Sequence, residues 1–407
     1  MKINLKLNKK DNYILTCSFG PDSMALCKAL IDGGYDFIIC HVNYHLCQED
    51  EERYLGMKTY SEQHNIKVIY KDIYIPKTEN EEGYAREKRY EFFIETAKKY
   101  NIRNILVAHN QDDLLETYLI QKKRKSIVSY YGLNESFIEQ DINITRPLLK
   151  YKKSDLELFC KETNTPFGID SSNFNTKFLR NKIRKEVVKD MDFEKRSILL
   201  NEIEEKNKLL KEKFSKLLPL IKDGGMYKED IEKLDNDSFQ LLLIKYFEIL
   251  NFYVPISLSF VKELKQIVSN KTTWHKTLKP NVIFSFDYGF LKLYFVKMPI
   301  FNFKVNHFEK NEYFTLNNES KLFNLIEKYD TLFIRSSFNS NEVFILHGLK
   351  KKINRCFIDW KVPYPIRIVW PGIFDINGNL LYVPHYKKNN IINVNSLLIF
   401  NLNDFIK

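Results

Sequence analysis

A short turn between Leu15 and Leu26 gathers polar groups at a place where phosphate could bind. The stretch reads LTCSFGPDSMAL, and its turn consists of Ser18, Phe19, Gly20, Pro21, Asp22 and Ser23. The apolar run before the turn suits a buried strand, and the run after it has the apolar spacing of a helix. The first backbone amides of a helix have no partners within the helix, so the turn could hold an anion. Asp22 and Ser23 could instead simply cap the helix, and the turn alone does not decide between these interpretations.

A second group of polar residues combines a histidine with three carboxylates. His109 follows the apolar run IRNILVA, and Asp112, Asp113 and Glu116 fall in the first turns of the helix expected next. Spacings of three and four residues put Glu116 on one helix face with Asp113 or with Asp112. The helix dipole is enough to explain any single carboxylate at a helix start. Three of them beside a histidine would suit a cationic substrate or Mg²⁺.

Basic side chains mark three further segments. Arg86 lies in EEGYAREKRYEFF, a predicted amphipathic helix, and could reach a phosphate, although a solvated helix face explains it as well. The segment IDSSNFNTKFLRNKIRKEV is either a basic surface helix or a clamp on a nucleotide or RNA backbone, and its candidates are Arg180, Asn181 and Arg184. Further candidates for contact with the substrate lie in the run QKKRKS, namely Lys122, Lys123 and Arg124.

The elements that would position these residues alternate between strands and helices from residue 13 to about residue 110. The strand-like runs YILTCS, YDFIICHVNY, KVIYKDIYI and IRNILVAHN are separated by segments with helical spacing. This alternation predicts an α/β fold, a parallel sheet with helices on both faces. Ligands of such sheets bind beyond the carboxyl ends of the strands. The turn, the run from His41 to His45 and the group at His109 all follow such ends, which favours a binding site over helix capping.

The chain of 407 residues is too long for one ordinary core, and its sequence texture changes along its length. We expect a first domain over residues 1–192, a connecting helix over 193–218, a helical domain over 219–291 and a small α+β domain over 292–407. The charged run RSILLNEIEEKNKLLKEKFSKLL indicates the connecting helix. Runs such as YFVKMPIFNFKV indicate strands in the last domain.

Charge and cysteine content narrow the class of protein. A net charge of +11 is consistent with a nucleic-acid partner, although solvated lysine surfaces would give the same surplus. The six cysteines, at positions 17, 27, 40, 47, 160 and 356, form no C-x-x-C pair, which predicts reduced thiols in a cytoplasmic protein. The sequence has no amino-terminal signal pattern and no apolar run long enough to span a bilayer, so we expect no membrane partner.

Taken together, these segments resemble the tRNA(Ile)-lysidine synthases, which are PP-loop ATP pyrophosphatases. SFGPDS is similar to the family's S-G-G-x-D-S turn, and HVNYHL, GYAREKRYEFF, AHNQDDLLET, RPLL and IDSSNFNTKFLRNKIR follow in the family's order. Other PP-loop enzymes share only the first motif. The segment KKKINRCFIDWKVPYPIRIVWPGIFDINGNLLYVPHYKK resembles the family's carboxyl-terminal domain, whereas residues from about 195 to 330 match only in texture. The resemblance implies a PP-loop, Rossmann-like first domain.

The resemblance also implies an activity. Such enzymes are ATP-dependent ligases that attach L-lysine to the wobble cytidine in the CAU anticodon of an isoleucine tRNA. ATP would adenylate the cytosine carbonyl oxygen with loss of pyrophosphate, and the lysine ε-amine would then displace AMP. Residues 18–23 would bind ATP, and Asp22 would serve adenylation through Mg²⁺ or the pyrophosphate. The helical and α+β domains would bind the tRNA, and a homodimer is compatible with this interpretation.

Roles for the residues around the acidic helix follow from the same resemblance. Asp113 and Glu116 are expected to hold the lysine, with Asp112 oriented toward structure or the metal. His109 is expected to take the proton from the attacking amine, because its unperturbed pKa of about 6.5 lies close to working pH. Arg86 is expected across the pocket, where it would steady the charge that develops on the adenylate.

Two departures from the family pattern affect these expectations. Phe19 stands where the family usually has glycine, and glycine at such a place often signals a positive φ or a close approach to phosphate. If this departure is harmless, replacing Phe19 by glycine should change activity little. The run QKKRKS replaces a more glycine-rich stretch.

Two other functions stay open at this point. A tRNA-thiolating PP-loop enzyme would also be basic, but it needs cysteines to carry sulfur or a cluster, and no cysteine pair here has ligand spacing. A nucleotide-binding RNA module without catalysis would result if Phe19 has spoiled the turn. Release of pyrophosphate from ATP that depends on tRNA and lysine would separate a synthase from such a module.

Overall fold

The computed structural model describes residues 1–45, 48–76, 81–168, 182–270, 273–298, 300–305, 312–336, 338, 342–346, 349–388, 391–392 and 396–407. The chain divides into two compact units, Met1–Phe214 with Phe247–Tyr253, and Ser215–Tyr246 with Val254–Lys407. Each unit has its own large hydrophobic core. Within the described ranges, none of the helices is both long and apolar enough to cross a membrane.

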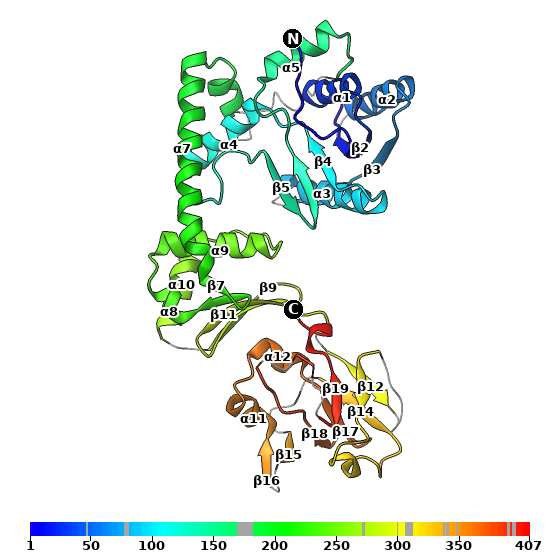
Figure 1. The fold of residues 1–407 in the computed structure, drawn as a ribbon, viewed down its shortest axis with the longest axis vertical. Coiled ribbons are helices and arrows are strands. Elements are labelled where there is room, and N and C mark those ends of the chain that lie inside the picture. Colours follow the sequence, from blue (N-terminus) through cyan, green and yellow to red (C-terminus); the bar gives the residue numbers. More distant parts are fainter. Residues whose placement is uncertain are drawn as a thin grey trace. The chain divides into compact units, whose positions relative to one another are not determined.

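The first unit is built on a six-stranded sheet in the order β3-β2-β1-β4-β6-β5 (Figure 1). Its parallel strands are β1 (Tyr13–Thr16), β2 (Phe37–Asn43), β3 (Val68–Asp72), β4 (Asn104–Val107) and β6 (Ile142–Thr145). The edge strand β5 (Ser136–Glu139) pairs antiparallel with β6. The parallel sheet predicted from the alternating pattern is therefore confirmed.

Helices cover both faces of this sheet. On one face, Phe93 of α3 (Glu81–Lys99) shares an apolar core with Ile14 of β1. Leu15, the next residue of β1, lies in the core of the opposite face. Successive residues of a strand point to opposite sides, so a strand buried on both faces is apolar throughout. Three helices cover that opposite face: α1 (Pro21–Gly33), α2 (Gln48–Gln63) and α5 (Lys153–Glu162).

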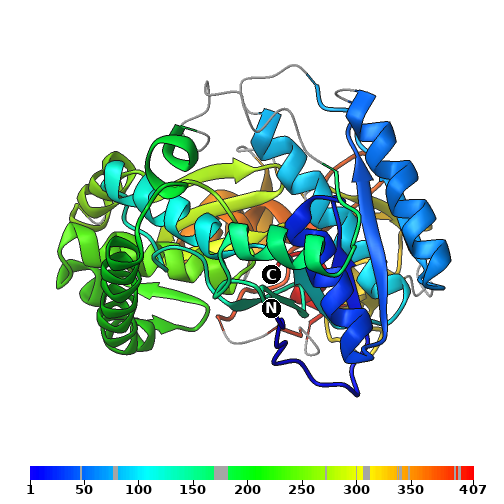
Figure 2. The same cartoon turned by 90° about the horizontal axis from the view of Figure 1, so that it is seen from above.

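Two more helices extend the first unit. α4 (Gln111–Lys123) follows β4, and α7 (Phe193–Leu217) is the long helix predicted over residues 193–218. α7 runs vertically in Figure 1 and is seen end-on in Figure 2. Leu115 of α4 and Ile203 of α7 lie in one small apolar core with Val188, which ends the short π-helical segment Arg184–Val188. This packing brings that segment beside α4.

The second unit begins with helices and an antiparallel sheet. The helices are α8 (Lys228–Glu232), α9 (Asn236–Ile249) and α10 (Leu258–Ser269). The sheet has the order β7-β8-β11-β10-β9, with β7 (Ile221–Lys222), β8 (Gly225–Tyr227), β9 (Trp274–Lys279), β10 (Val282–Asp287) and β11 (Phe290–Phe295). The segment 219–291, expected to be helical, thus contains most of a sheet, and the expected boundary at residue 292 falls inside β11. Strand β9 reads WHKTLK with mostly exposed positions, so its pattern lacks the apolar alternation that marks a half-buried strand.

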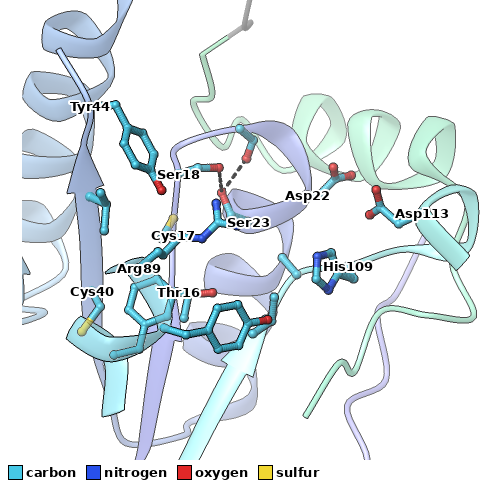
Figure 3. A pocket seen from close by; sticks show the side chains of 16 residues that line it. Thr16, Cys17, Ser18, Asp22, Ser23, Cys40, Tyr44, Arg89, His109 and Asp113 are labelled. Atoms are coloured by element: carbon cyan, nitrogen blue, oxygen red, sulfur yellow. Dashed lines mark hydrogen bonds between the residues drawn. The ribbon is translucent and has the colours of Figure 1, made fainter. Parts of the chain in front are cut away.

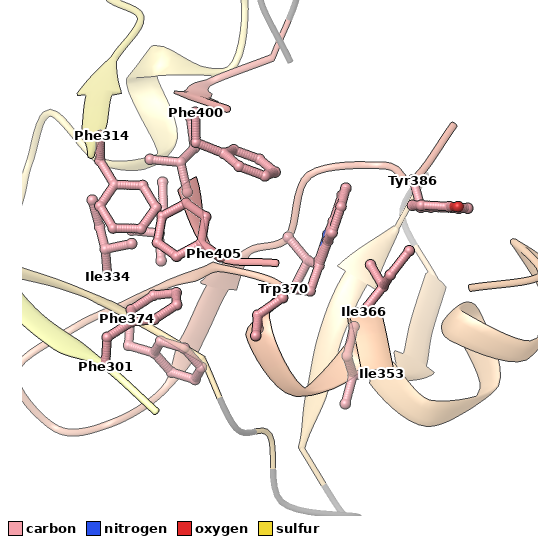
Figure 4. Close-up of a cluster of buried hydrophobic side chains, with 14 of the residues drawn as sticks. Phe301, Phe314, Ile334, Ile353, Ile366, Trp370, Phe374, Tyr386, Phe400 and Phe405 are labelled. Carbon is pink, nitrogen blue, oxygen red and sulfur yellow. The ribbon is translucent and has the colours of Figure 1, made fainter. Parts of the chain in front are cut away.

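The remainder of the second unit packs around an aromatic core in which Trp370 lies with Phe314, Phe400 and Phe405 (Figure 4). The indole N–H of Trp370 donates to the carbonyl oxygen of Pro384 at 2.9 Å, which satisfies its one buried polar group. The surrounding sheet has the order β12-β14-β17-β18, and its strands span Asn302–Val305, Leu332–Arg335, Gly372–Phe374 and Leu380–Tyr382. Two strand pairs and two helices complete this α+β region: β13 (Phe314–Leu316) with β19 (Leu398–Phe400), β15 (Val343–Leu346) with β16 (Leu349–Lys352), α11 (Ile353–Asp359) and α12 (Tyr364–Val369).

Candidate active site

A pocket of about 230 Å³ opens at the carboxyl ends of β1, β2 and β4 (Figure 3). After β1, the chain adds β2 and β3 on one side of this strand and then β4 on its other side, so the strand order reverses at β1. Ligands of open α/β sheets bind at such a switch point. The structure brings the turn after β1 and the start of α4 together at this edge. The polar lining of the pocket includes Ser18, Asp22, Ser23, Arg89, His109 and Asp113.

The turn leads into a helix that has no side-chain cap. The N-cap of α1 is Gly20, and Pro21 occupies the first turn. Ser23 Oγ donates to the carbonyl oxygen of Gly20 at 3.0 Å and lies 3.5 Å from Ser18 Oγ. Neither Asp22 nor Ser23 therefore acts as the N-cap, which removes the simpler explanation of the turn.

Asp22 is a half-buried carboxylate in an unfavourable environment. Burial raises its pKa to about 7, and the negative charge of Asp113 adds to this, while Lys153 and the side chain of Asn110 act in the opposite direction. Its Oδ1 is buried and has no hydrogen-bond partner among the residues described. In Figure 3 the carboxylates of Asp22 and Asp113 point toward one another. Two carboxylates held close together raise the cost of ionising both, so this site favours a cation.

Helix α4 starts with a reciprocal cap. Oδ1 of Asn110 accepts the N–H of Asp113 at 3.0 Å, and Oδ2 of Asp113 accepts the N–H of Asn110 at 3.0 Å. Such a capping box satisfies two backbone donors at once. One oxygen of Asp113 therefore fixes the helix start, and its Oδ1 lies 3.3 Å from Nη2 of Arg184.

Glu116 is fully buried and is paired with Arg184. Nε of Arg184 donates to Oε1 at 2.6 Å, and Nη2 donates to Oε2 at 3.0 Å. Burial lowers the pKa of Arg184, but the hydrogen bond and the charge of Glu116 outweigh this and leave it raised. The predicted cation site at Asp113 and Glu116 thus holds a cation from the chain itself. The predicted use of Arg184 as a clamp on an RNA backbone does not fit this inward-facing pair.

Asp112 has a structural partner. Its Oδ1 accepts from Nη1 of Arg196 at 2.7 Å, and both side chains are largely buried. Arg196 also donates to the carbonyl oxygen of Val188 at 2.8 Å. This contact ties α7 to the start of α4, in line with the structural orientation expected for Asp112.

His109 lines the pocket, but its hydrogen bond disagrees with the predicted role of general base. Nε of Arg146 donates to Nδ1 of His109 at 2.9 Å. A guanidinium has no acceptor, so Nδ1 must accept, and the neutral ring then carries its proton on Nε2. Taking up a second proton would break this bond and place an imidazolium beside a guanidinium. His109 is therefore suited to donate a hydrogen bond into the pocket.

Arg89, rather than Arg86, lines the pocket. Arg86 is exposed, and its guanidinium carbon lies 4.8 Å from the ring centroid of Tyr90. Arg89 lies four positions before Phe93, which also lines the pocket, so the two share a helix face. Arg86 likewise lies four positions before Tyr90, another residue of the pocket lining, so helical spacing alone does not distinguish the two arginines.

The remaining predicted residues lie away from the pocket or outside the described ranges. Lys122 and Lys123 border a separate groove of about 360 Å³ whose apolar lining includes Leu119 and Ile183. Nζ of Lys122 donates to the carboxylate of Glu202 at 2.9 and 3.0 Å. Arg124 is the exposed C-cap of α4. Arg180 and Asn181 lie outside the residues that the structure describes.

Comparison with known proteins assigns the chain to a family. Residues 2–191 match the PP-loop domain. A tRNA(Ile)-lysidine synthase of Mycoplasma mycoides subsp. mycoides SC is 30% identical over 400 residues, which cover 92% of this chain and 97% of that protein. The chain belongs to the tRNA(Ile)-lysidine synthase family.

Other members of the synthase family repeat this match. The protein of Staphylococcus aureus strain N315 is 27% identical over 407 residues, covering 92% of this chain and 93% of that protein. The protein of Mesoplasma florum is 41% identical over 183 residues, covering 44% of this chain and 46% of that protein. The family resemblance seen in the motifs is therefore confirmed, and it supports a synthase over a thiolating enzyme or an RNA module.

A solved structure of a thiolase is more distant. The U34-tRNA thiolase NcsA from Methanococcus maripaludis, with its [4Fe-4S] cluster, has a TM-score of 0.43 and 13% identity, covering 50% of this chain and 73% of that chain. This likeness is too low to bear on function. The five cysteines within the described ranges are buried and unpaired, and no group of three or more His, Cys, Asp or Glu there could hold a metal ion.

Proposed function

We propose that this chain uses ATP to attach L-lysine to the wobble cytidine of an isoleucine tRNA with the anticodon CAU. Membership of the synthase family supports this activity. The observation that carries it is the pocket at the switch point, where an uncapped helix start and Arg89 lie close to two carboxylates. Such a pocket has partners for the anionic phosphates of ATP and for a cationic amino acid. A cytoplasmic location and a homodimer stay predictions from the sequence.

Residues 18–23 would bind the phosphates of ATP. The first amides of α1 are not used by a side-chain cap, and helix starts attract negative charge. Arg89 would pair with the phosphates and so take the role that the sequence suggested for Arg86. A guanidinium presents several donors to phosphate in a fixed geometry, which gives strong, directed hydrogen bonds.

The carboxylate of Asp22 fits a magnesium ion. Mg²⁺ in nucleotide sites is typically held by one or two carboxylates together with substrate phosphates. The buried Oδ1 of Asp22, without a hydrogen-bond partner among the described residues, is a suitable ligand. When bound, the ion would offset the charge of the phosphates and of the leaving pyrophosphate.

The cluster of Asp113, Glu116 and Arg184 would bind the lysine. Two carboxylates against one guanidinium leave the cluster with a net negative charge, so it still attracts an ammonium group. Both oxygens of Glu116 are occupied by Arg184. Glu116 would therefore act by holding Arg184, which is a partner for the α-carboxylate of lysine, while Asp113 would receive an ammonium group.

The reaction would take two steps. The cytosine carbonyl oxygen attacks the α-phosphorus of ATP, and the bond to pyrophosphate breaks. The ε-amine of lysine then attacks the activated ring carbon, and AMP leaves with the oxygen. Because Nδ1 of His109 is used by Arg146, His109 would donate from Nε2 to a phosphate oxygen of the adenylate, and Asp113 would receive the proton of the amine.

The test is pyrophosphate release from ATP together with the incorporation of labelled lysine into tRNA. Both should require the isoleucine tRNA, and the methionine tRNA with the same anticodon should not be labelled. Asp22→Ala should abolish pyrophosphate release without loss of helical circular dichroism. The matched control is Asp32→Asn, which changes an exposed carboxylate of the same helix, paired with Lys28, and should leave turnover unchanged. Normal turnover by Asp22→Ala, or labelling by an amino acid other than lysine, would refute the proposal.

The groove beside Lys123 would contribute to tRNA binding. Lys123 and Arg124 are exposed, and a lysine or arginine that contacts a phosphate makes the affinity fall with salt concentration. Replacing either by alanine should weaken tRNA binding and reduce its salt dependence, without changing the KM for ATP. The second unit should also hold tRNA. A chain that ends near residue 215 would also lack residues 247–253 of the first unit, so its loss of tRNA binding would not be specific to the second unit.

A further inference from the structure

Phe19 has a backbone conformation that side chains rarely adopt. Its φ is +63°, in the left-handed region that glycine enters freely and that a Cβ disfavours. Its side chain is nevertheless only 7% exposed and belongs to the core on the α1 face of the sheet. A bulky residue thus holds a glycine-type conformation in the middle of the proposed ATP turn, and its ring is not free to leave.

The ring of Phe19 fits against helix α2 because residue 56 is glycine. A Cβ at position 56 would lie 2.5 Å from Cζ of the ring and closer still to Cε1, nearer than non-bonded carbon atoms can approach. Glycine inside a helix lowers stability relative to alanine. The ring of Phe19 explains why glycine is useful at this helical position.

The backbone of Phe19 is held from another side. The N–H of Gly168 donates to the carbonyl oxygen of Phe19 at 2.8 Å. A Cβ at Gly168 would lie 3.4 Å from Cδ1 of the ring and 2.8 Å from Cγ of Arg53. Helix α2 and the segment after α5, both distant in sequence from the turn, therefore fix residue 19 together.

We propose that Phe19 is a positioning residue for ATP, a role that rests on the proposed binding of ATP by this turn. Phe19 is not among the residues that line the pocket, so its ring acts by holding the backbone of the turn rather than by touching the nucleotide. With its ring seated against Gly56, the turn is held in the left-handed conformation that carries the chain from β1 into the start of α1. A flexible residue would visit many other conformations, and binding would then have to select the competent one.

The first test measures the fit of the ring and does not depend on ATP. Phe19→Gly keeps the left-handed backbone but removes the ring, so the variant is expected to fold. Gly56→Ala should lower the melting temperature of the wild type, because the new methyl group collides with the ring. In the Phe19→Gly background the same substitution should leave the melting temperature unchanged or raise it, because alanine favours a helix. If Gly56→Ala lowers the melting temperature equally in both backgrounds, the proposed packing of the Phe19 ring against Gly56 is overturned.

The second test measures positioning through the KM for ATP in pyrophosphate release. If the freed turn is competent about one-tenth of the time, Phe19→Gly raises this KM about tenfold and leaves kcat and the KM for lysine nearly unchanged. Leu30→Ala is the matched control, because Leu30 is a fully buried residue of the same core at the other end of α1. It should lower stability without raising the KM for ATP.

The outcomes separate this inference from the proposed function. A wild-type protein that releases no pyrophosphate from ATP would overturn the proposed function and the positioning role with it. An active wild type with an unchanged KM for ATP in Phe19→Gly would overturn the positioning role alone. If Leu30→Ala raises the KM for ATP as much as Phe19→Gly does, at an equal loss of stability, the rise comes from general weakening of the core. That result also overturns the positioning role of Phe19.

Discussion

Replacing Arg184 by methionine should destabilise the first unit far more than the loss of a surface ion pair. Glu116 is fully buried, and both of its oxygens would lose their guanidinium donors. Removing one partner of a buried ion pair commonly costs about 3–5 kcal/mol, because the other charge is left without compensation. The side chain of Arg184 is 25% exposed, so water can reach part of the gap. We therefore expect a loss near the lower end of that range, about 3 kcal/mol.

Two further variants show whether the loss comes from the stranded charge. In the double variant Glu116→Gln with Arg184→Met no charge stays buried, so this protein should be more stable than Arg184→Met alone. Lys28→Met is a surface control. Its partner Asp32 is 49% exposed, and loss of that pair should cost at most about 1 kcal/mol.

The assay has to resolve the two units. All three tryptophans, at positions 274, 360 and 370, lie in the second unit. In Arg184→Met, the urea-unfolding transition of the second unit, followed by tryptophan fluorescence, should therefore be unchanged. The transition of the first unit, followed by far-ultraviolet circular dichroism, should move to a lower urea concentration. A shift of less than about 1 kcal/mol in Arg184→Met, or a double variant that is no more stable than Arg184→Met, would refute the reasoning.

Three other predictions concern the pocket. Because the pKa of Asp22 is raised to about 7, its carboxylate binds a proton more tightly in the folded protein than in the unfolded chain. This proton binding contributes fully to the free energy of unfolding below pH 4, and the contribution is lost as the pH rises through about 7. In the absence of Mg²⁺, the free energy of unfolding of the wild type should therefore fall by up to about 2 kcal/mol more between pH 5.5 and 8 than that of Asp22→Asn. Parallel pH profiles of the two proteins in urea unfolding would contradict this. Arg89→Ala should raise the KM for ATP about tenfold or more and Arg86→Ala much less, whereas equal effects would count against the choice of Arg89. His109→Gln should keep more activity than His109→Ala, because an amide can accept from Arg146 and still donate, and equal losses in both variants would restore the role of base.

Local patterns were sufficient to predict strands β1 to β4 of the first sheet and the long helix, whereas β5 and β6 were not predicted. The apolar run at β1 is buried along its whole length, as expected of a strand covered on both faces. The acidic helix start at Asn110 also follows a local rule, since Asn followed three residues later by a carboxylate can form a reciprocal cap. Each of these features depends on residues that are neighbours in sequence.

The chemical state of the site depends on partners that the sequence does not place together. Arg184 is 68 positions from Glu116, and Arg146 is 37 positions from His109. No local rule chooses these partners, and each one changes the role of the residue it contacts. The paired Glu116 becomes a support for Arg184, and His109 becomes a donor instead of a base. For the same reason the sheet of the second unit was missed, because β9 is recognisable only through its pairing with β10.

The carboxylates of α1 and α4 near the pocket differ in how far their charges are compensated. Asp112 is paired with Arg196, and Glu116 is paired with Arg184, so these two carboxylates are compensated and fix the helix. Asp22 is different, because its buried Oδ1 has no hydrogen-bond partner among the described residues and Asp113 raises its pKa further. A carboxylate whose buried oxygen lacks full compensation lowers stability, and fold stability alone gives no reason to keep it. This uncompensated carboxylate lies near the carboxyl end of β1, beside the turn proposed for ATP. A cation that accompanies the phosphates would have to bind at this place.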